Sequence, residues 1–196
     1  MASVKLSDEL KEAISNMPLK EKDKLLFRLV AKDAALVEKL KFQLLESDVD
    51  AKEKRREELY REINQHLEDY ERYYYSPGYL LLELRSISGV INRHVKTTKD
   101  KYGEVVLNLF MLNKSLALFI DRINKARPQK QGTLRSYVLK RAAKILNLIK
   151  RMHPDMRLDF EDDLIQLGQL ISQNQLMLDT AHHEGLDIDR LLRPNL

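Results

Sequence analysis

The chain of 196 residues contains no cysteine and no tryptophan. Without cysteine there can be no disulfide framework, no thiolate nucleophile and no cysteine-bound zinc. Glycine and proline are also scarce, at six and five residues, which favours long helices over many short strands. No long apolar stretch follows Met1, so the sequence lacks the pattern of a secretory signal. We therefore expect a cytoplasmic protein with no disulfides.

The longest apolar run is VVLNLFMLNKSLALFI, residues 105–120, in which twelve of sixteen residues are apolar and Lys114 is the only charge. At helical spacing its apolar side chains point to all sides, which is typical of a helix buried among other helices or of a membrane span. A span needs about 20 apolar residues, and Asn108, Asn113 and Lys114 interrupt this run. We therefore predict a central core helix over about residues 104–126 and no membrane association.

Apolar residues recur at helical spacing through the rest of the chain and predict eight or nine helices. The expected fold class is all-α, an irregular bundle or stacked helical hairpins around the central helix. We expect residues 1–46 to form an N-terminal three-helix segment that packs on the rest of the chain. Residues 50–196 should form the main helical domain. In that segment, the helix after Pro18 should bury a face that contains Leu26 and Leu29.

Two short segments look like breaks between helices. Ser-Pro-Gly at residues 76–78 fits a type II turn in which glycine adopts a positive φ. Residues 127–132, RPQKQG, have the composition of a loop, and we expect the following helix to begin near Thr133.

Charge is unevenly distributed along the chain. Residues 122–151 contain ten Lys or Arg and no acidic residue, whereas residues 155–196 contain nine acidic and three basic residues. Residues 1–121 are balanced, with 21 of each sign. The overall charge of +4 therefore conceals a segment of +10 next to one of −6.

The basic segment 122–151 has two interpretations. Its cations could form a face that binds a polyanion such as nucleic acid, with strong salt dependence and little sequence preference. Alternatively, the basic helix packs near the acidic C-terminal helix, whose field offsets it. The candidate polyanion-binding residues are Arg127, Lys130, Lys140, Arg141, Lys144 and Arg151.

Arg141 differs from the other candidates because it lies close to the apolar stripe of its helix. A buried unpaired charge is very costly. Its guanidinium must therefore reach solvent or pair with a carboxylate or with a ligand's phosphate.

Five tyrosines gather around the break at residues 76–78, with Arg72 among them. Tyrosine provides a large contact area at low entropy cost and suits partner surfaces. Packing inside the helical hairpin accounts for Tyr70 and Tyr74. The remaining candidates for a protein-partner surface are Arg72, Tyr73, Tyr75 and Tyr79.

The helix predicted before this break, residues 51–75, is highly charged and carries only a narrow apolar stripe. A second subunit could complete such a stripe, so self-association as a homodimer is one expectation.

No catalytic constellation is present: the sequence has no HExxH, no GxSxG and no phosphate-binding glycine loop. Glu58 and Glu62 resemble, by their spacing alone, the carboxylate pairs with which all-helical nucleotide pyrophosphohydrolases hold magnesium, but they lie on the solvent side of their helix. We expect no metal, no cofactor and no small-molecule ligand.

The leading interpretation is a non-enzymatic binding or scaffold protein, and the alternative is nucleic-acid or polyanion binding through residues 122–151.

Overall fold

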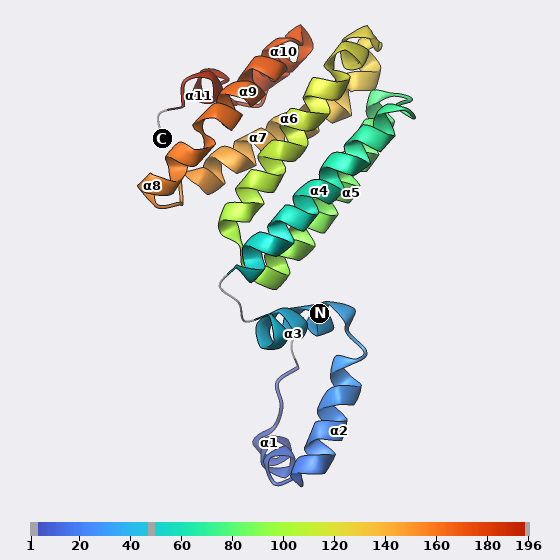
Figure 1. Cartoon of the computed structure of the whole chain (residues 1–196), viewed down its shortest axis with the longest axis vertical. Coiled ribbons are helices and arrows are strands. Elements are labelled where there is room, and N and C mark those ends of the chain that lie inside the picture. The colour runs from blue at the N-terminus through green and yellow to red at the C-terminus, as the bar shows by residue number, and fades with distance from the viewer. Residues whose placement is uncertain (1–3, 47–49, 195–196) are drawn as a thin grey trace. The chain divides into compact units, whose positions relative to one another are not determined.

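The structure, a computed structural model, describes residues 4–46 and 50–194 (Figure 1). Every regular element in these two ranges is helical, and neither range contains a strand. The predicted all-α fold is confirmed. The chain divides into two compact units, Met1–Asp48 and Val49–Leu196, which we call the N-terminal unit and the main unit.

The N-terminal unit contains three short helices, α1 (Asp8–Ser15), α2 (Leu19–Val30) and α3 (Ala34–Leu45). Side chains cap two of them: Ser7 Oγ accepts from the Leu10 amide at 3.3 Å, and Asp33 accepts from the amides of Ala35 and Leu36. None of the three helices has a buried residue. Local capping therefore specifies these helices, but the unit has no core of its own. That this segment packs on the rest of the chain stays a prediction.

The main unit is built from longer helices and a few short turns (Figure 1). Proline occupies a first-turn position in three of them, where its missing amide hydrogen costs no helical hydrogen bond. The elements are α4 (Ala51–Glu71), α5 (Pro77–Thr98), α6 (Lys101–Lys125), α7 (Pro128–Ile149), α8 (Pro154–Arg157), the 3-10 turn η1 (Leu158–Phe160), α9 (Glu161–Ser172), α10 (Gln175–His183) and α11 (Asp189–Leu192).

Helix α6 packs against α4, α5, α7 and α9. Its apolar side chains are buried on more than one face, among them Leu107, Leu109 and Phe119, which have no exposed surface. Each large side chain of this kind contributes ~1.5–3 kcal/mol on burial, so α6 supplies a large share of the core. Its polar residues Asn108 and Asn113 are buried with it.

Helix α6 is also long and apolar enough to span a membrane, and it is the one helix in the described part of the chain with that length and composition. The 16-residue apolar run is too short to span, but the full helix of 25 residues is not. Of the 18 consecutive residues that form its most apolar part, 72% are buried inside the protein. Core helices pass the same test as membrane helices.

The type II turn predicted at residues 76–78 is wrong. Ser76 is instead the N-cap of α5, and its Oγ accepts from the Tyr79 amide. Pro77 occupies the first turn of the helix, and Gly78 already lies inside it. A serine followed by proline is a favoured helix start, and this pairing explains the difference.

The loop predicted at residues 127–132 is also wrong, because α7 begins at Pro128. Gln131 is buried, and its side-chain amide donates to the Ala126 carbonyl at 2.7 Å. This bond ties the first turn of α7 to the end of α6, so a segment of loop-like composition is helical.

The narrow apolar stripe of α4 is covered within the chain. Leu59, Ile63 and Leu67 are buried, and α4 packs on α5 and α6. This stripe therefore provides no surface for a second subunit and gives no reason to expect a homodimer.

Two glycines inside helices allow a direct test of the packing. A Cβ added at Gly89 in α5 would have no neighbour within 4 Å, whereas one at Gly168 in α9 would lie 2.9 Å from Leu192 Cδ2 and 3.0 Å from Leu191 Cβ. Alanine favours helix over glycine by about 0.5–1 kcal/mol. Gly89→Ala should therefore raise the free energy of unfolding by about that amount.

Gly168→Ala should lower it, by about 1–3 kcal/mol, because α11 must move to admit the new methyl group. Urea unfolding of both variants measures the two changes. Equal effects of the same sign would contradict the close contact between α9 and α11.

Candidate functional site

A groove with a volume of about 710 Å³ lies between α5 and α7, which pack side by side. We call it the α5–α7 groove. Four cationic side chains line it: Arg85, Lys140, Arg141 and Lys144. The remaining lining residues are small or polar: Asn92, Gly132, Thr133, Ser136 and Tyr137. No lining residue carries a carboxylate, so the groove is a positively charged surface.

Arg141 is held at the groove by neutral partners. Its Nη1 donates to Asn108 Oδ1 and its Nη2 to the Tyr137 hydroxyl, each at 3.2 Å. The guanidinium also lies over the Tyr137 ring, 5.3 Å from its centroid. Tyr137 in turn hydrogen-bonds to the Leu84 carbonyl, at 3.1 Å, and to Ser88 Oγ. Arg141 is therefore oriented by residues of α5, α6 and α7 without being neutralised.

The two lysines of the groove do meet carboxylates. Lys144 Nζ lies 2.8 Å from Oε1 of Glu104, whose side chain is 7% exposed. Lys140 is 72% exposed, and its Nζ lies 3.8 Å from Oε1 of Glu184, which also accepts from Ser136 Oγ at 2.7 Å. Lys144 thus has a close, buried partner, whereas Lys140 has a distant one.

These contacts leave a net positive charge. The four cations face two carboxylates, so the six side chains sum to +2. Within the described ranges, neither Arg85 nor Arg141 has a carboxylate at ion-pair distance. Glu184 follows α10, which packs on α7, so the acidic C-terminal segment does reach the basic helix and offsets part of its charge.

The structure brings only half of the predicted polyanion-binding residues together. Lys140, Arg141 and Lys144 line the groove, whereas Arg127, Lys130 and Arg151 are exposed and do not. The first two of these lie at the start of α7, and Arg151 lies beyond its end.

Sequence reasoning missed Arg85. It lies on α5, far along the chain from the basic segment, in a region where charges of both signs are mixed. Only the packing of α5 on α7 places it opposite the lysines.

The tyrosines near residues 70–79 divide into two groups. Tyr70 and Tyr74 pack on Phe119, with ring centroids 5.7 and 5.1 Å from its own. Burial raises the pKa of Tyr74 to about 12. These two tyrosines belong to the core of the helical hairpin.

The other four candidates, Arg72, Tyr73, Tyr75 and Tyr79, are all exposed. Tyr75 and Tyr79 contact each other edge to face, with centroids 5.3 Å apart. We call this exposed group the tyrosine turn.

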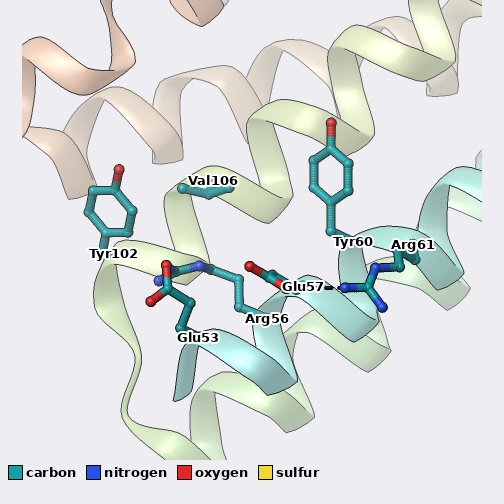
Figure 2. Close-up of a pocket in the computed structure, with 7 residues that line it drawn as sticks. All are labelled: Glu53, Arg56, Glu57, Tyr60, Arg61, Tyr102 and Val106. Carbon is teal, nitrogen blue, oxygen red and sulfur yellow. Dashed lines mark hydrogen bonds and ion pairs between the residues drawn. The ribbon is translucent and has the colours of Figure 1, made fainter. Parts of the chain in front are cut away.

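A second cavity, of about 330 Å³, lies beside α4 and the first turns of α6. Figure 2 shows Tyr60 and Tyr102 on either side of Val106, with charged side chains of α4 below them. Its charges pair within α4: Arg56 lies 3.3 Å from Glu53, and Arg61 lies 3.1 Å from Glu57. This cavity has no uncompensated charge to offer a ligand.

Arg56 also stabilises the start of α6. Its Nη1 lies 3.4 Å from Oδ2 of Asp100, which caps α6 by accepting from the Gly103 amide at 2.8 Å. His94 Nε2 also lies 3.5 Å from Asp100 Oδ2. Burial alone would raise the pKa of Asp100, but the hydrogen bonds from His94 and Gly103 and the charge of Arg56 hold it below its ordinary value.

Among the described residues, no group of three His, Asp or Glu side chains lies close enough together to hold a metal ion. Glu58 and Glu62 are exposed and line neither cavity.

The N-terminal unit has large apolar side chains that its own helices do not cover. Six on α2 and α3 are each more than half exposed: Leu19, Leu26, Phe27, Leu29, Leu44 and Leu45. We call them the N-terminal apolar surface. The expectation that Leu26 and Leu29 are buried is wrong, because three short helices do not provide enough neighbours to cover them.

The chain matches no family model, and no curated protein or solved structure is significantly similar to it.

The ion pair beneath the groove makes stability depend on pH. Burial alone would raise the pKa of Glu104, but the hydrogen bond and charge of Lys144, with those of Lys101, hold it below its ordinary value of 4.5. The folded protein therefore keeps Glu104 ionised to lower pH than the unfolded chain does. This contribution to stability is complete above pH 4.5 and is lost as the pH falls through the lowered pKa.

Glu104→Gln should accordingly lower the free energy of unfolding at neutral pH by about 1 kcal/mol, and the deficit should shrink in acid. Urea unfolding at neutral pH and below pH 4.5 measures it. Glu57→Gln, which alters an exposed pair within α4, serves as the control. A deficit for Glu104→Gln that is the same at both pH values would contradict the lowered pKa.

Proposed function

We propose that the protein is a cytoplasmic, non-enzymatic binding scaffold that self-associates through the N-terminal apolar surface. The observation that carries the proposal is that six large apolar side chains are exposed while none of the described residues of this unit, 4–46, is buried. Each such side chain is stabilised by ~1.5–3 kcal/mol when it leaves water.

A unit of this size needs an external source of stability. Chains below about 40 residues usually fold only with disulfides, metals or oligomerisation, and the described part of this unit, residues 4–46, is close to that limit. Disulfides are excluded because the chain has no cysteine. The described residues contain no cluster that could hold a metal. Contact with a surface outside the unit, on the main unit or on a second chain, is the remaining route.

A second copy of the chain suits this surface best. Leu19, Leu26 and Leu29 follow one another at i, i+7 and i+10 and share one side of α2, as residues do along the seam of paired helices. Residues 4–46 contain nine basic and eight acidic residues. Two copies can therefore approach with almost no net repulsion, and a strongly charged partner has no advantage.

Self-association of this kind uses the same surface twice, as in a two-fold dimer. The main unit would then be free to bind a protein partner through the exposed tyrosine turn. Tyrosine and arginine are enriched in such contacts.

Sedimentation velocity of the full chain over a range of concentrations tests the proposal. Wild type should form a dimer whose fraction rises with concentration. The double variant Leu26→Asp, Leu29→Asp should be monomeric, because association would bury four unpaired carboxylates per dimer.

The matched control is Leu82→Asp, Leu158→Asp, which changes two similarly exposed leucines of the main unit. This variant should dimerise like wild type. A monomeric wild type at the highest concentration, or dissociation of the control, would contradict association through the N-terminal unit.

A further inference from the structure

The α5–α7 groove holds positive charge that the protein itself does not neutralise. Arg141 uses two N–H groups in its bonds to Asn108 and Tyr137, and a guanidinium has five. Arg85, on the opposite wall, has no carboxylate partner among the described residues. The two walls therefore face each other with unused donors and uncompensated charge, which is an arrangement that attracts an anion.

We propose that the α5–α7 groove binds the phosphate backbone of a single-stranded nucleic acid. This activity is separate from self-association. A planar guanidinium matches the oxygens of a phosphate, and lysines supply further charge. The fixed orientation of Arg141 means that little side-chain entropy is lost on binding.

The length of the groove favours a chain of phosphates over a single one. Its lining residues on α7 run from Gly132 to Lys144, which at 1.5 Å per residue is about 18 Å of helix. Lys140 and Lys144 are one turn apart, about 6 Å along the axis. A small molecule is a poorer fit, because such pockets are lined mostly by apolar side chains, and this one is polar and cationic.

The shape of the groove favours one strand over a duplex. Proteins read duplex DNA mainly by projecting a helix or strands into its grooves, whereas here the two helices are the walls of a hollow. The one aromatic side chain that lines the hollow, Tyr137, is covered by Arg141 and its hydroxyl is hydrogen-bonded. With one face of this ring occupied, stacking on bases should contribute little, so binding should show little sequence preference.

The ion pairs set how many phosphates are neutralised. Lys144 is held by Glu104, which leaves Arg85, Lys140 and Arg141 for the ligand. Single strands release about 0.7 counterions per neutralised phosphate, so the plot of log K against log salt should have a slope of about −2 for three contacts.

Fluorescence anisotropy with labelled oligo-dT and oligo-U of equal length, titrated with the full chain at several salt concentrations, tests the proposal. Arg85→Glu and Lys140→Glu should each weaken binding about tenfold and make the slope shallower by about 0.7. Lys130→Glu makes the same charge change on α7 outside the groove, and it should have little effect.

Three results would overturn the proposal. They are no binding at low salt, equal loss in Arg85→Glu and Lys130→Glu, and tighter binding of a duplex of the same length. Thermal unfolding confirms that each variant is folded, which is expected because all three side chains are exposed. The double variant Leu26→Asp, Leu29→Asp should keep wild-type affinity for a short strand, so failure of self-association and failure of the groove are distinguishable.

Discussion

Burial of α6 among four other helices is the constraint on which the main unit depends, because the polar groups buried with that helix lose water and are stabilised by partners inside the protein. Asn108 shows the consequence. Its amide donates to the Glu104 carbonyl at 2.6 Å, and its oxygen accepts from Arg141. Through Tyr137 the same network reaches α5. A polar residue that interrupts the apolar run therefore also orients the arginine of the groove, so the core and the candidate site share one set of hydrogen bonds.

The two units differ in the source of their stability. The main unit buries a continuous apolar core, whereas the N-terminal unit has capped helices and no buried residue within its described range, 4–46. Local signals are enough to start and end a short helix, but isolated helices of this length are marginal in water without a packed face. The same residues that leave the N-terminal unit without a core give it a surface for association. The N-terminal apolar surface suits an apolar partner, whereas the cationic groove of the main unit suits an anionic one.

Periodicity predicted most helices because it reports which residues share a face. The central helix expected over 104–126 corresponds to α6, Lys101–Lys125. Boundaries were wrong where composition misled, as at Pro128, which begins a helix inside a loop-like segment. Periodicity cannot say whether an apolar face has a neighbour, so it predicts burial of Leu26, which is exposed. It also cannot pair distant helices. Lys140 and Lys144 were therefore found from the basic segment, whereas Arg85 required the packing of α5 on α7.

Hydrogen exchange of the intact chain, followed at several protein concentrations, tests most directly whether the two units draw their stability from different sources. Amides of α6 should exchange most slowly, at a rate independent of concentration, because they open only when the main core opens. Amides of α2 and α3 should become more protected as concentration rises, because association stabilises them by mass action. Protection of α2 and α3 that is strong and independent of concentration would contradict this account, since the N-terminal unit would then be stable without a second copy.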